Sequence, residues 1–315
     1  MSRLVSLVMP VWRPRRAWLR AAIARALNEP ACELELIVVD DGNEQPVAML
    51  LDDIDDPRLR ILRIDHAGPY AARNAGIAAA HGDFVRFLDA DDLVEPGSTG
   101  RLLALAGAGE EVLAYGATVM FDDGPVPLRV ATSDVEGRAA EECLLGGFDV
   151  FVVSLLFPRA VLERVGPWEE TAFSVSGDWD FVLRALEQAP VRPLHETVTH
   201  YRRHPASVTK TARTADGTRA GRLVLDRYFQ RHPEQRGGAL ERRAYTNLHL
   251  SRARAHARGR QPRLALEQLA LAARHDPSAA ATVSLRFGRE RVRARLGGLV
   301  TRARRRERRA RQRRA

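Results

Sequence analysis

Short apolar runs and stretches with helical spacing alternate along the first hundred residues. The runs predict strands at 4–11, 34–39, 59–64 and 84–88, and the helical spacing predicts helices at 18–27 and 70–81. Strands that alternate with helices favour an α/β fold, a Rossmann-like and mostly parallel sheet with helices on both faces. Right-handed crossovers bring the carboxyl ends of such strands to one edge of the sheet, where ligands bind.

The pattern changes after the first hundred residues. Residues 107–176 are irregular apart from a strand-like run at 150–157, and a helix at 179–188 and a strand at 197–201 follow. Residues 217–283 then predict helices alone, and 245–278 resemble one tetratricopeptide-like hairpin that turns at Gly259. One such hairpin cannot bury its apolar face by itself, so we expect it to dock on the α/β body or on a partner.

The composition is that of a globular protein. Of 315 residues, 45% are hydrophobic and 28% charged, which excludes wholesale disorder and a polytopic membrane protein. The longest apolar run, 151–157, is far shorter than the roughly 20 residues that cross a bilayer. The first residues lack the charged and apolar regions of a signal peptide, so we expect a cytoplasmic protein.

The positive charge is concentrated in a tail. Residues 286–315 hold 14 Arg and 2 Glu, which leaves residues 1–285 with a net charge of −3 out of the total of +9. Such a tail favours anionic surfaces, and we expect it to attach the protein to the inner face of the cytoplasmic membrane. A merely solvated tail is the alternative. Nucleic acid is a weaker candidate, because no aromatic residue that could stack on bases follows Phe287.

Acidic clusters follow two of the predicted strands. Asp40 and Asp41 come after the run at 34–39, and the segment 89–92, Asp-Ala-Asp-Asp, comes after 84–88. Aspartates are also common turn residues, so either cluster alone is weak evidence. Because neighbouring carboxylates repel each other, the second cluster predicts a hard divalent cation bound through one or two carboxylates and substrate phosphates.

A segment rich in small residues lies between the two clusters. Residues 68–77 read Gly-Pro-Tyr-Ala-Ala-Arg-Asn-Ala-Gly-Ile, and small side chains allow a helix to approach the sheet closely. Arg73 can offer its planar fork of donors to phosphate oxygens. A structural salt bridge to one of the same acids is the alternative for this arginine.

Seven motifs together resemble family 2 glycosyltransferases, which have the GT-A fold and a D-x-D metal motif. The resemblance covers about residues 3–210. The motifs stand at 8–12, 38–42, 72–77, 87–92, 157–168, 176–184 and 201–205. No single motif is decisive, but their common order makes coincidence improbable.

The resemblance implies a nucleotide-sugar site. Pro10, Val11 and Asp41 would line the base pocket, Asp89 would meet the ribose or a metal-bound water, and Arg73 would lie on the nucleotide side. Arg13 stands where the family often has Asn, and Asn43 where it often has Ser. These two departures put the preferred base in doubt but leave UDP or dTDP favoured.

The resemblance also implies the catalytic groups. Asp91 would ligate Mg²⁺ or Mn²⁺ at the diphosphate, His204 would reach the metal or the diphosphate, and Asp178 would be the base that deprotonates the acceptor hydroxyl in an inverting transfer. The acid often found before the base is Gly177 here. Asp180 is therefore the other candidate base, although Asp178 keeps the motif position.

We therefore expect an inverting glycosyltransferase that moves a sugar from a nucleotide-sugar to a saccharide or lipid-linked acceptor in envelope or surface polysaccharide synthesis. Its expected organisation is a GT-A domain at 1–212, with a nucleotide-binding half at 1–106 and an acceptor half at 107–212, a helical region at 213–283 and a basic tail at 284–315.

Two other functions are compatible with parts of this pattern. A sugar-nucleotide nucleotidyltransferase would show a Gly-rich loop after the first strand, where residues 10–14 contain no glycine. A non-catalytic binding protein would have no reason to keep Asp89, Asp91 and Asp178 together. Both are therefore secondary hypotheses.

Overall fold

A computed structural model describes residues 3–278 apart from 108, 110, 123–126, 149, 174 and 205–214. The chain divides into two compact units, residues 1–224 and 225–315. The predictions for the basic tail at 284–315 and for Pro205 lie outside the described residues. Each unit is described by itself below.

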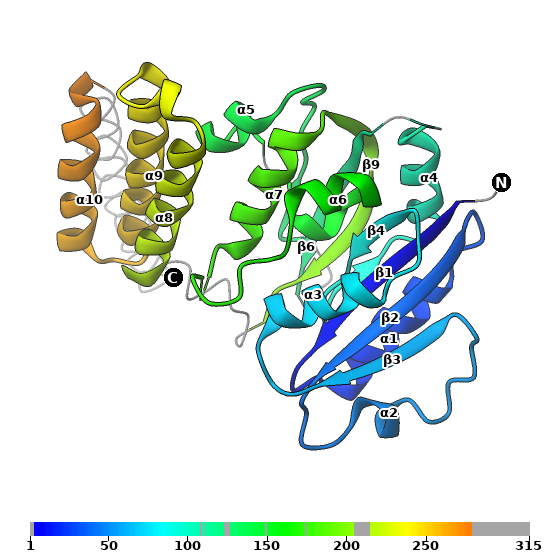
Figure 1. The fold of residues 1–315 in the computed structure, drawn as a ribbon. Coiled ribbons are helices and arrows are strands. Elements are labelled where there is room, and N and C mark those ends of the chain that lie inside the picture. The colour runs from blue at the N-terminus through cyan, green and yellow to red at the C-terminus, as the bar shows by residue number, and fades with distance from the viewer. Residues whose placement is uncertain are drawn as a thin grey trace, which may run out of the picture. The chain divides into compact units, whose positions relative to one another are not determined.

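The first unit is built on a sheet whose N-terminal half is parallel (Figure 1). Neighbouring strands in the order β3-β2-β1-β4 all pair in parallel. Their bounds are β1 (Leu4–Val11), β2 (Glu33–Asp41), β3 (Leu59–Ile64) and β4 (Phe84–Phe87). The strands predicted at 4–11, 34–39, 59–64 and 84–88 are thereby confirmed to within one or two residues, together with the mixed α/β fold.

The sheet continues past β4 with β8, β6, β9 and β5, while β7 pairs with β6. The bounds are β5 (Leu93–Val94), β6 (Leu113–Phe121), β7 (Arg129–Ala131), β8 (Leu155–Pro158) and β9 (Val191–Arg202). β6 and β9 are parallel, and the other pairs in this half are antiparallel.

Three predictions for this half were wrong in detail. The irregular stretch at 107–176 contains β6, β7 and β8 as well as two helices. The strand expected at 150–157 is a 3₁₀ turn, Val152–Ser154, followed by β8. β9 is longer than the predicted 197–201, because its first residues, which include Pro193 and the partly exposed His195, carry no strand signal of their own.

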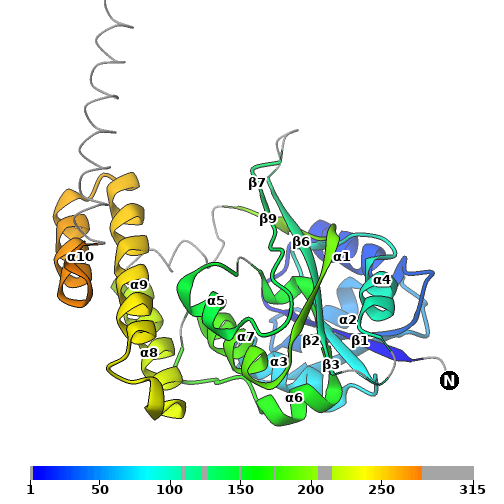
Figure 2. The same cartoon turned by 90° about the horizontal axis from the view of Figure 1, so that it is seen from above.

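Helices cover both faces of the sheet, as Figures 1 and 2 show. One face, which carries Leu7 and Met9 of β1, packs on α1 and α4. The other face, which carries Val8, packs on α3. The helix bounds are α1 (Arg16–Leu27), α2 (Val47–Leu50), α3 (Pro69–Ala79), α4 (Ser98–Leu105), α5 (Ala140–Leu145), α6 (Arg159–Val165) and α7 (Gly177–Gln188).

The small residues of α3 serve its close approach to the sheet. A Cβ atom on Gly76 would lie 2.3 Å from Cγ1 of Val8, so a larger residue has no room there. On the same face, Trp168 stacks on Phe181 of α7 with 3.9 Å between ring centroids and meets Phe87 of β4 edge-on at 5.3 Å. This aromatic cluster fastens α7 beside the end of β4.

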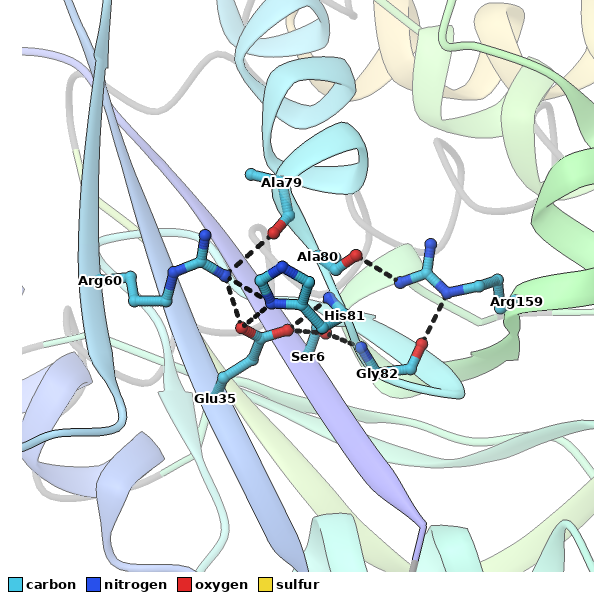
Figure 3. A network of polar contacts seen from close by, with 8 residues as sticks. All are labelled: Ser6, Glu35, Arg60, Ala79, Ala80, His81, Gly82 and Arg159. Carbon is cyan, nitrogen blue, oxygen red and sulfur yellow. Dashed lines mark hydrogen bonds and ion pairs between the residues drawn. The ribbon is translucent and has the colours of Figure 1, made fainter.

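A polar network joins the amino ends of the strands, at the edge opposite the acidic clusters (Figure 3). Glu35 of β2 accepts hydrogen bonds from Ser6 Oγ at 2.6 Å, from the backbone N–H of His81 at 2.6 Å and from Arg60 Nη1 at 2.7 Å. Arg159 donates to two backbone carbonyls in the same turn after α3. Burial raises the pKa of Glu35, but these bonds outweigh it and lower that pKa to about 2.

The C-terminal region is helical over its described part. α8 (Ala215–Arg231) begins in the first unit and continues into the second, and a short 3₁₀ turn, Pro233–Gln235, follows it. α9 (Ala239–Arg258) and α10 (Pro262–His275) pack against each other around Leu250 and Ala272, with the turn at Gly259 that the sequence predicts. The resemblance of this helical hairpin to a tetratricopeptide unit stays a prediction. None of the described helices is both long and apolar enough to span a membrane.

Candidate active site

Three parallel strands deliver the predicted residues to one edge of the sheet. Val11 at the end of β1 is opposite Asp40 at the end of β2, and Val8 is opposite Phe87 at the end of β4. Pro10, Val11 and both acidic clusters therefore meet at the carboxyl edge, where ligands bind in such sheets. This is the juxtaposition that the sequence pattern predicts.

Asp40 is a buried structural anchor. Its carboxylate accepts hydrogen bonds from the backbone N–H groups of Asn43 and Val47, both at 2.9 Å, and from Arg63 Nη1 at 2.8 Å. Burial raises its pKa, but these bonds dominate and lower the pKa below the usual aspartate value. Asp40 is therefore ionised at neutral pH and holds the turn after β2.

Asp41, the residue predicted in the base pocket, holds the segment before α3. Its carboxylate accepts from the N–H groups of Ala67 and Gly68 at 2.8 and 3.1 Å, and His66 Nδ1 lies 2.9 Å from it. The His66 ring stacks on Trp12 with 3.7 Å between centroids. The carboxylate of Asp41 is thus buried and bound by the protein at both oxygens.

Asn43 ties the ends of β1 and β2 together. Its Nδ2 donates to the carbonyl of Val11 at 2.8 Å, and its Oδ1 accepts the N–H of Arg13 at 2.6 Å. Arg13 has a φ of 46°, in the left-handed region that most residues avoid. A cavity of about 570 Å³ beside this turn is lined by Trp12, Arg13 and Asn43 among others, whereas Pro10, Val11 and Asp41 do not line it.

Arg73 reaches from α3 to the end of β4. Its Nη2 lies 2.6 Å from Asp89 Oδ1, and its guanidinium lies over the ring of Trp168 at 4.8 Å. The salt bridge that the sequence left as an alternative for Arg73 is therefore present. The pair also places a cation and a carboxylate beside each other at the carboxyl edge.

Asp91 and His204 face each other. His204 Nε2 lies 2.7 Å from Asp91 Oδ2, and the His204 ring packs on Trp18 of α1 at 4.9 Å. The chain turns after Asp89, so Asp89 and Asp91 have different partners. Burial, and next the charge of Asp89, raise the pKa of Asp91.

The Asp91–His204 pair fits part of a divalent cation site. Two converging ligands suffice for an ion that keeps several waters and binds substrate phosphates. The raised pKa of Asp91 is consistent with this, since a cation would favour the ionised carboxylate. Among the described residues, no group of three or more His, Cys, Asp or Glu side chains could hold a metal by itself.

Asp92, the last residue of the cluster, has a role that the sequence did not assign. It is fully buried, and its Oδ1 accepts the N–H of Arg202 at 2.8 Å. Burial, and next the charges of Asp89 and Asp91, raise its pKa well above the usual range. Asp92 thus fixes the acidic turn to the end of β9, two residues before His204.

Asp178 and Asp180 lie on the first turn of α7 in opposite environments. Asp180 is buried and pairs with Arg184 Nε at 2.9 Å, while Arg184 also donates to the carbonyls of Val165 and Pro167. Asp178 is accessible to solvent yet surrounded by protein. The resulting loss of solvation raises its pKa, and the nearby Arg73 partly offsets this rise.

Tyr70, which no sequence pattern singled out, lies beside Asp178 at the start of α7. Its hydroxyl oxygen accepts the N–H of Gly177 at 3.0 Å, and its ring stacks on Trp168. Burial, and next the charge of Asp178, raise the pKa of Tyr70, while the charge of Arg73 lowers it. Only its place in a helix of small residues could have singled it out in the sequence.

Comparisons with known proteins point to one family. Residues 6–161 match the model of glycosyl transferase family 2. The chain is 32% identical over 181 residues to the succinoglycan biosynthesis protein ExoU of Rhizobium meliloti (strain 1021), which covers 52% of each chain. It is 27% identical over 221 residues to the uncharacterized glycosyltransferase EpsJ of Bacillus subtilis (strain 168), covering 67% of this chain and 64% of EpsJ.

The fold also matches a solved structure. Residues 1–349 of S. aureus TarS in complex with UDP-GlcNAc superpose with a TM-score of 0.61 at 15% identity, covering 91% of this chain and 92% of that one. The chain spans about half the length, or less, of the first curated relatives that it matches. Through the domain that includes residues 6–161, the chain belongs to glycosyl transferase family 2.

Proposed function

We propose that this protein is an inverting glycosyltransferase that transfers a sugar from a nucleotide-sugar, UDP- or dTDP-linked, to a hydroxyl acceptor. The observation that carries the proposal is the row of charged groups at the carboxyl edge: Asp178, the Arg73–Asp89 pair and the Asp91–His204 pair. These residues come from α7, α3, the end of β4 and the segment after β9. They are brought together by the fold, since they lie far apart in the sequence.

The row suits a displacement at an anomeric carbon. Asp178 Oδ takes the proton of the acceptor hydroxyl while the acceptor oxygen forms a bond to that carbon. The bond from the carbon to the diphosphate oxygen breaks, and the nucleoside diphosphate leaves with both electrons of this bond. Attack opposite the leaving group inverts the configuration. The raised pKa of Asp178 makes it a stronger base than an ordinary aspartate.

Asp91 and His204 would hold a divalent metal, Mg²⁺ or Mn²⁺. When bound, such an ion supplies charge compensation for the departing diphosphate. Arg73 offers the same diphosphate a cation of the protein's own, which a phosphate oxygen could share with Asp89. At the ends of β1 and β2, Pro10, Val11 and Asp41 would receive the base.

The relatives support a role in polysaccharide synthesis. ExoU is named for succinoglycan biosynthesis, and the TarS structure holds UDP-GlcNAc. We propose a saccharide or lipid-linked acceptor for this protein. The arginines of 286–315 would bring it to the anionic inner face of the cytoplasmic membrane.

The variant Asp178→Asn tests the base. Removing a general base costs about 10²–10⁴-fold, so kcat should fall by that factor while the affinity for UDP is unchanged. The measurement is initial rates of sugar transfer with Mn²⁺, and of donor hydrolysis in the absence of acceptor. Asp134→Asn, at a side chain that is 86% exposed, is the matched control and should leave both rates unchanged.

The pH profile gives the same test a second readout. Because the pKa of Asp178 is raised, the wild-type rate should fall on the acid side at a pH above the usual aspartate value of about 3.9. The residual rate of the Asp178→Asn variant should not show this fall at acid pH. An Asp178→Asn enzyme with near wild-type kcat would refute the assignment of the base.

A further inference from the structure

The phenol of Tyr70 occupies the space of a side chain at position 177. A Cβ atom on Gly177 would lie 2.4 Å from Cζ of Tyr70 and 2.7 Å from its hydroxyl oxygen. Real Cβ atoms do not come this close to a ring atom, so position 177 must stay glycine while Tyr70 keeps its place. Two residues that are 107 positions apart thus fit each other at the residue before Asp178.

The Tyr70 hydroxyl has a proton to give. Its oxygen accepts the N–H of Gly177 at 3.0 Å, and its own proton has no acceptor in the part of the chain that the structure describes. A hydroxyl that accepts one hydrogen bond is polarised toward donating another. Burial, and next the charge of Asp178, raise the pKa of Tyr70, so the phenol keeps this proton at neutral pH.

The ring of Tyr70 is stacked beside the charged row. It lies on Trp168 with 5.6 Å between centroids and planes 9° apart, and Trp168 in turn stacks on Phe181. The hydroxyl contacts Gly177, the residue before Asp178, and the ring shares Trp168 with Arg73, which pairs with Asp89. Tyr70 is therefore connected both to the residue before the proposed base and to the arginine of the nucleotide side.

We propose that the hydroxyl of Tyr70 donates a hydrogen bond to an oxygen of the transferred sugar and so orients the anomeric carbon toward Asp178. This inference rests on the proposed function, in which Asp178 serves the acceptor and Arg73–Asp89 adjoins the diphosphate. The transferred sugar would then lie between these two groups, and Tyr70 adjoins one through Gly177 and the other through Trp168. The partner would be a hydroxyl or acyl oxygen of the sugar, since a phenol can donate a hydrogen bond to either.

The variant Tyr70→Phe removes the hydroxyl and keeps the stacked ring. Calorimetry with UDP, dTDP, UDP-glucose, UDP-N-acetylglucosamine and dTDP-glucose measures its effect. The Kd of the free nucleotide should change less than twofold, whereas the best-bound sugar nucleotide should bind about two- to tenfold more weakly, the range for one hydrogen bond. Tyr115→Phe is the control, since it likewise removes one phenol hydroxyl, but one that donates to the carbonyls of Ser133 and Val135 outside the row.

A second variant tests the fit between the two residues. Gly177→Ala places a Cβ against Tyr70 and should displace the ring, so it too should weaken the sugar nucleotide and spare the free nucleotide. Thermal melting of each variant separates this selective loss from unfolding, because an unfolded fraction lowers binding of both ligands equally.

The outcomes separate this inference from the proposed function. If the wild type binds a sugar nucleotide and Asp178→Asn slows transfer, yet Tyr70→Phe weakens both ligands equally or neither, the role of Tyr70 is refuted and the proposed function stands. If the wild type binds no sugar nucleotide of the panel, both are refuted. A loss confined to the sugar nucleotide in both variants supports the proposal.

Discussion

The aspartates at the carboxyl edge differ from one another in their burial and in their hydrogen-bond partners. Asp40 is buried with several donors around it and acts as an anchor, and Asp180 is buried in an ion pair with Arg184. Asp178 is accessible to solvent, and Asp91 pairs with one histidine. The proton and the metal ion are assigned to Asp178 and Asp91, which keep access to solvent, because a fully buried carboxylate cannot reach a substrate or an ion.

Asp91→Asn tests the metal site at this scale. An amide has half the acceptor capacity of a carboxylate and no charge, so Mn²⁺ affinity and Mn²⁺-dependent turnover should both fall by at least tenfold. Calorimetric titration of Mn²⁺ into the protein in the presence of UDP measures the Mn²⁺ affinity, and initial rates of sugar transfer measure the turnover. Asp134→Asn should match the wild type. Unchanged Mn²⁺ binding by Asp91→Asn would remove this residue from the site.

The hydrogen-bond network of Glu35 joins β1, β2, β3 and the turn after α3. We therefore expect it to contribute to the stability of the fold. Glu35→Gln keeps the shape but loses the charge that Arg60 and the backbone bind. It should lower the free energy of unfolding by about 1.5–3 kcal/mol, measured by urea denaturation. Asp53→Asn, in the exposed pair with Arg20, is the control and should leave the free energy of unfolding nearly unchanged, because solvent screens exposed ion pairs.

The same variant predicts the pH dependence of stability. The folded pKa of Glu35 is about 2, below the unfolded value of about 4.3. Its contribution is therefore complete above the unfolded pKa and is lost as pH falls toward the folded pKa. The difference between wild type and Glu35→Gln should shrink from pH 6 to pH 3. A difference that is constant over this range would contradict the network's role.

Regular elements with a strong local pattern were predictable from the sequence. Apolar runs in β1 and β2 and the small residues of α3 each carry their own signal. β6 carries a weaker signal, because Gly116 interrupts it and nearly every one of its side chains is buried, so no alternation is visible. Its position depends on pairing with β8 and β9, which lie far along the chain.

The site was predictable to a similar degree. Resemblance named Asp178, Asp91 and His204, but it could not separate the environments of Asp178 and Asp180, which depend on Arg184 and two carbonyls of the segment before α7. The pairing of Tyr70 with Gly177 was invisible, since it depends on a contact between two helices distant in sequence. Long-range contacts of this kind leave no periodic trace in one sequence.

The concentration of positive charge in residues 286–315 predicts binding to anionic membranes. With 14 arginines in 286–315, full-length protein should sediment with vesicles of phosphatidylglycerol and phosphatidylcholine at low salt, since each arginine near an anionic surface contributes roughly 1 kcal/mol. A chain ending at residue 283 should stay in the supernatant, and salt should release the full-length protein. Donor hydrolysis should persist in the shorter chain.

Vesicles without anionic lipid are the control for this experiment. Full-length protein that ignores anionic vesicles at low salt but binds RNA would contradict the membrane role. Equal binding by both chains would assign the attachment to another part of the molecule.

The place of β9 in the sheet sets the order in which the site can be completed during synthesis. β1 to β4 can pair once residue 87 has left the ribosome, but β6 pairs in parallel with β9, and Asp92 is fixed by Arg202. His204 comes two residues later. A nascent chain can thus form the parallel half of the sheet while the Asp91–His204 pair and the anchor of the acidic turn are still missing. Under the function proposed above, transfer would begin only when the last strand of the sheet is in place, so that unfinished copies of the enzyme would leave the cell's sugar nucleotides intact.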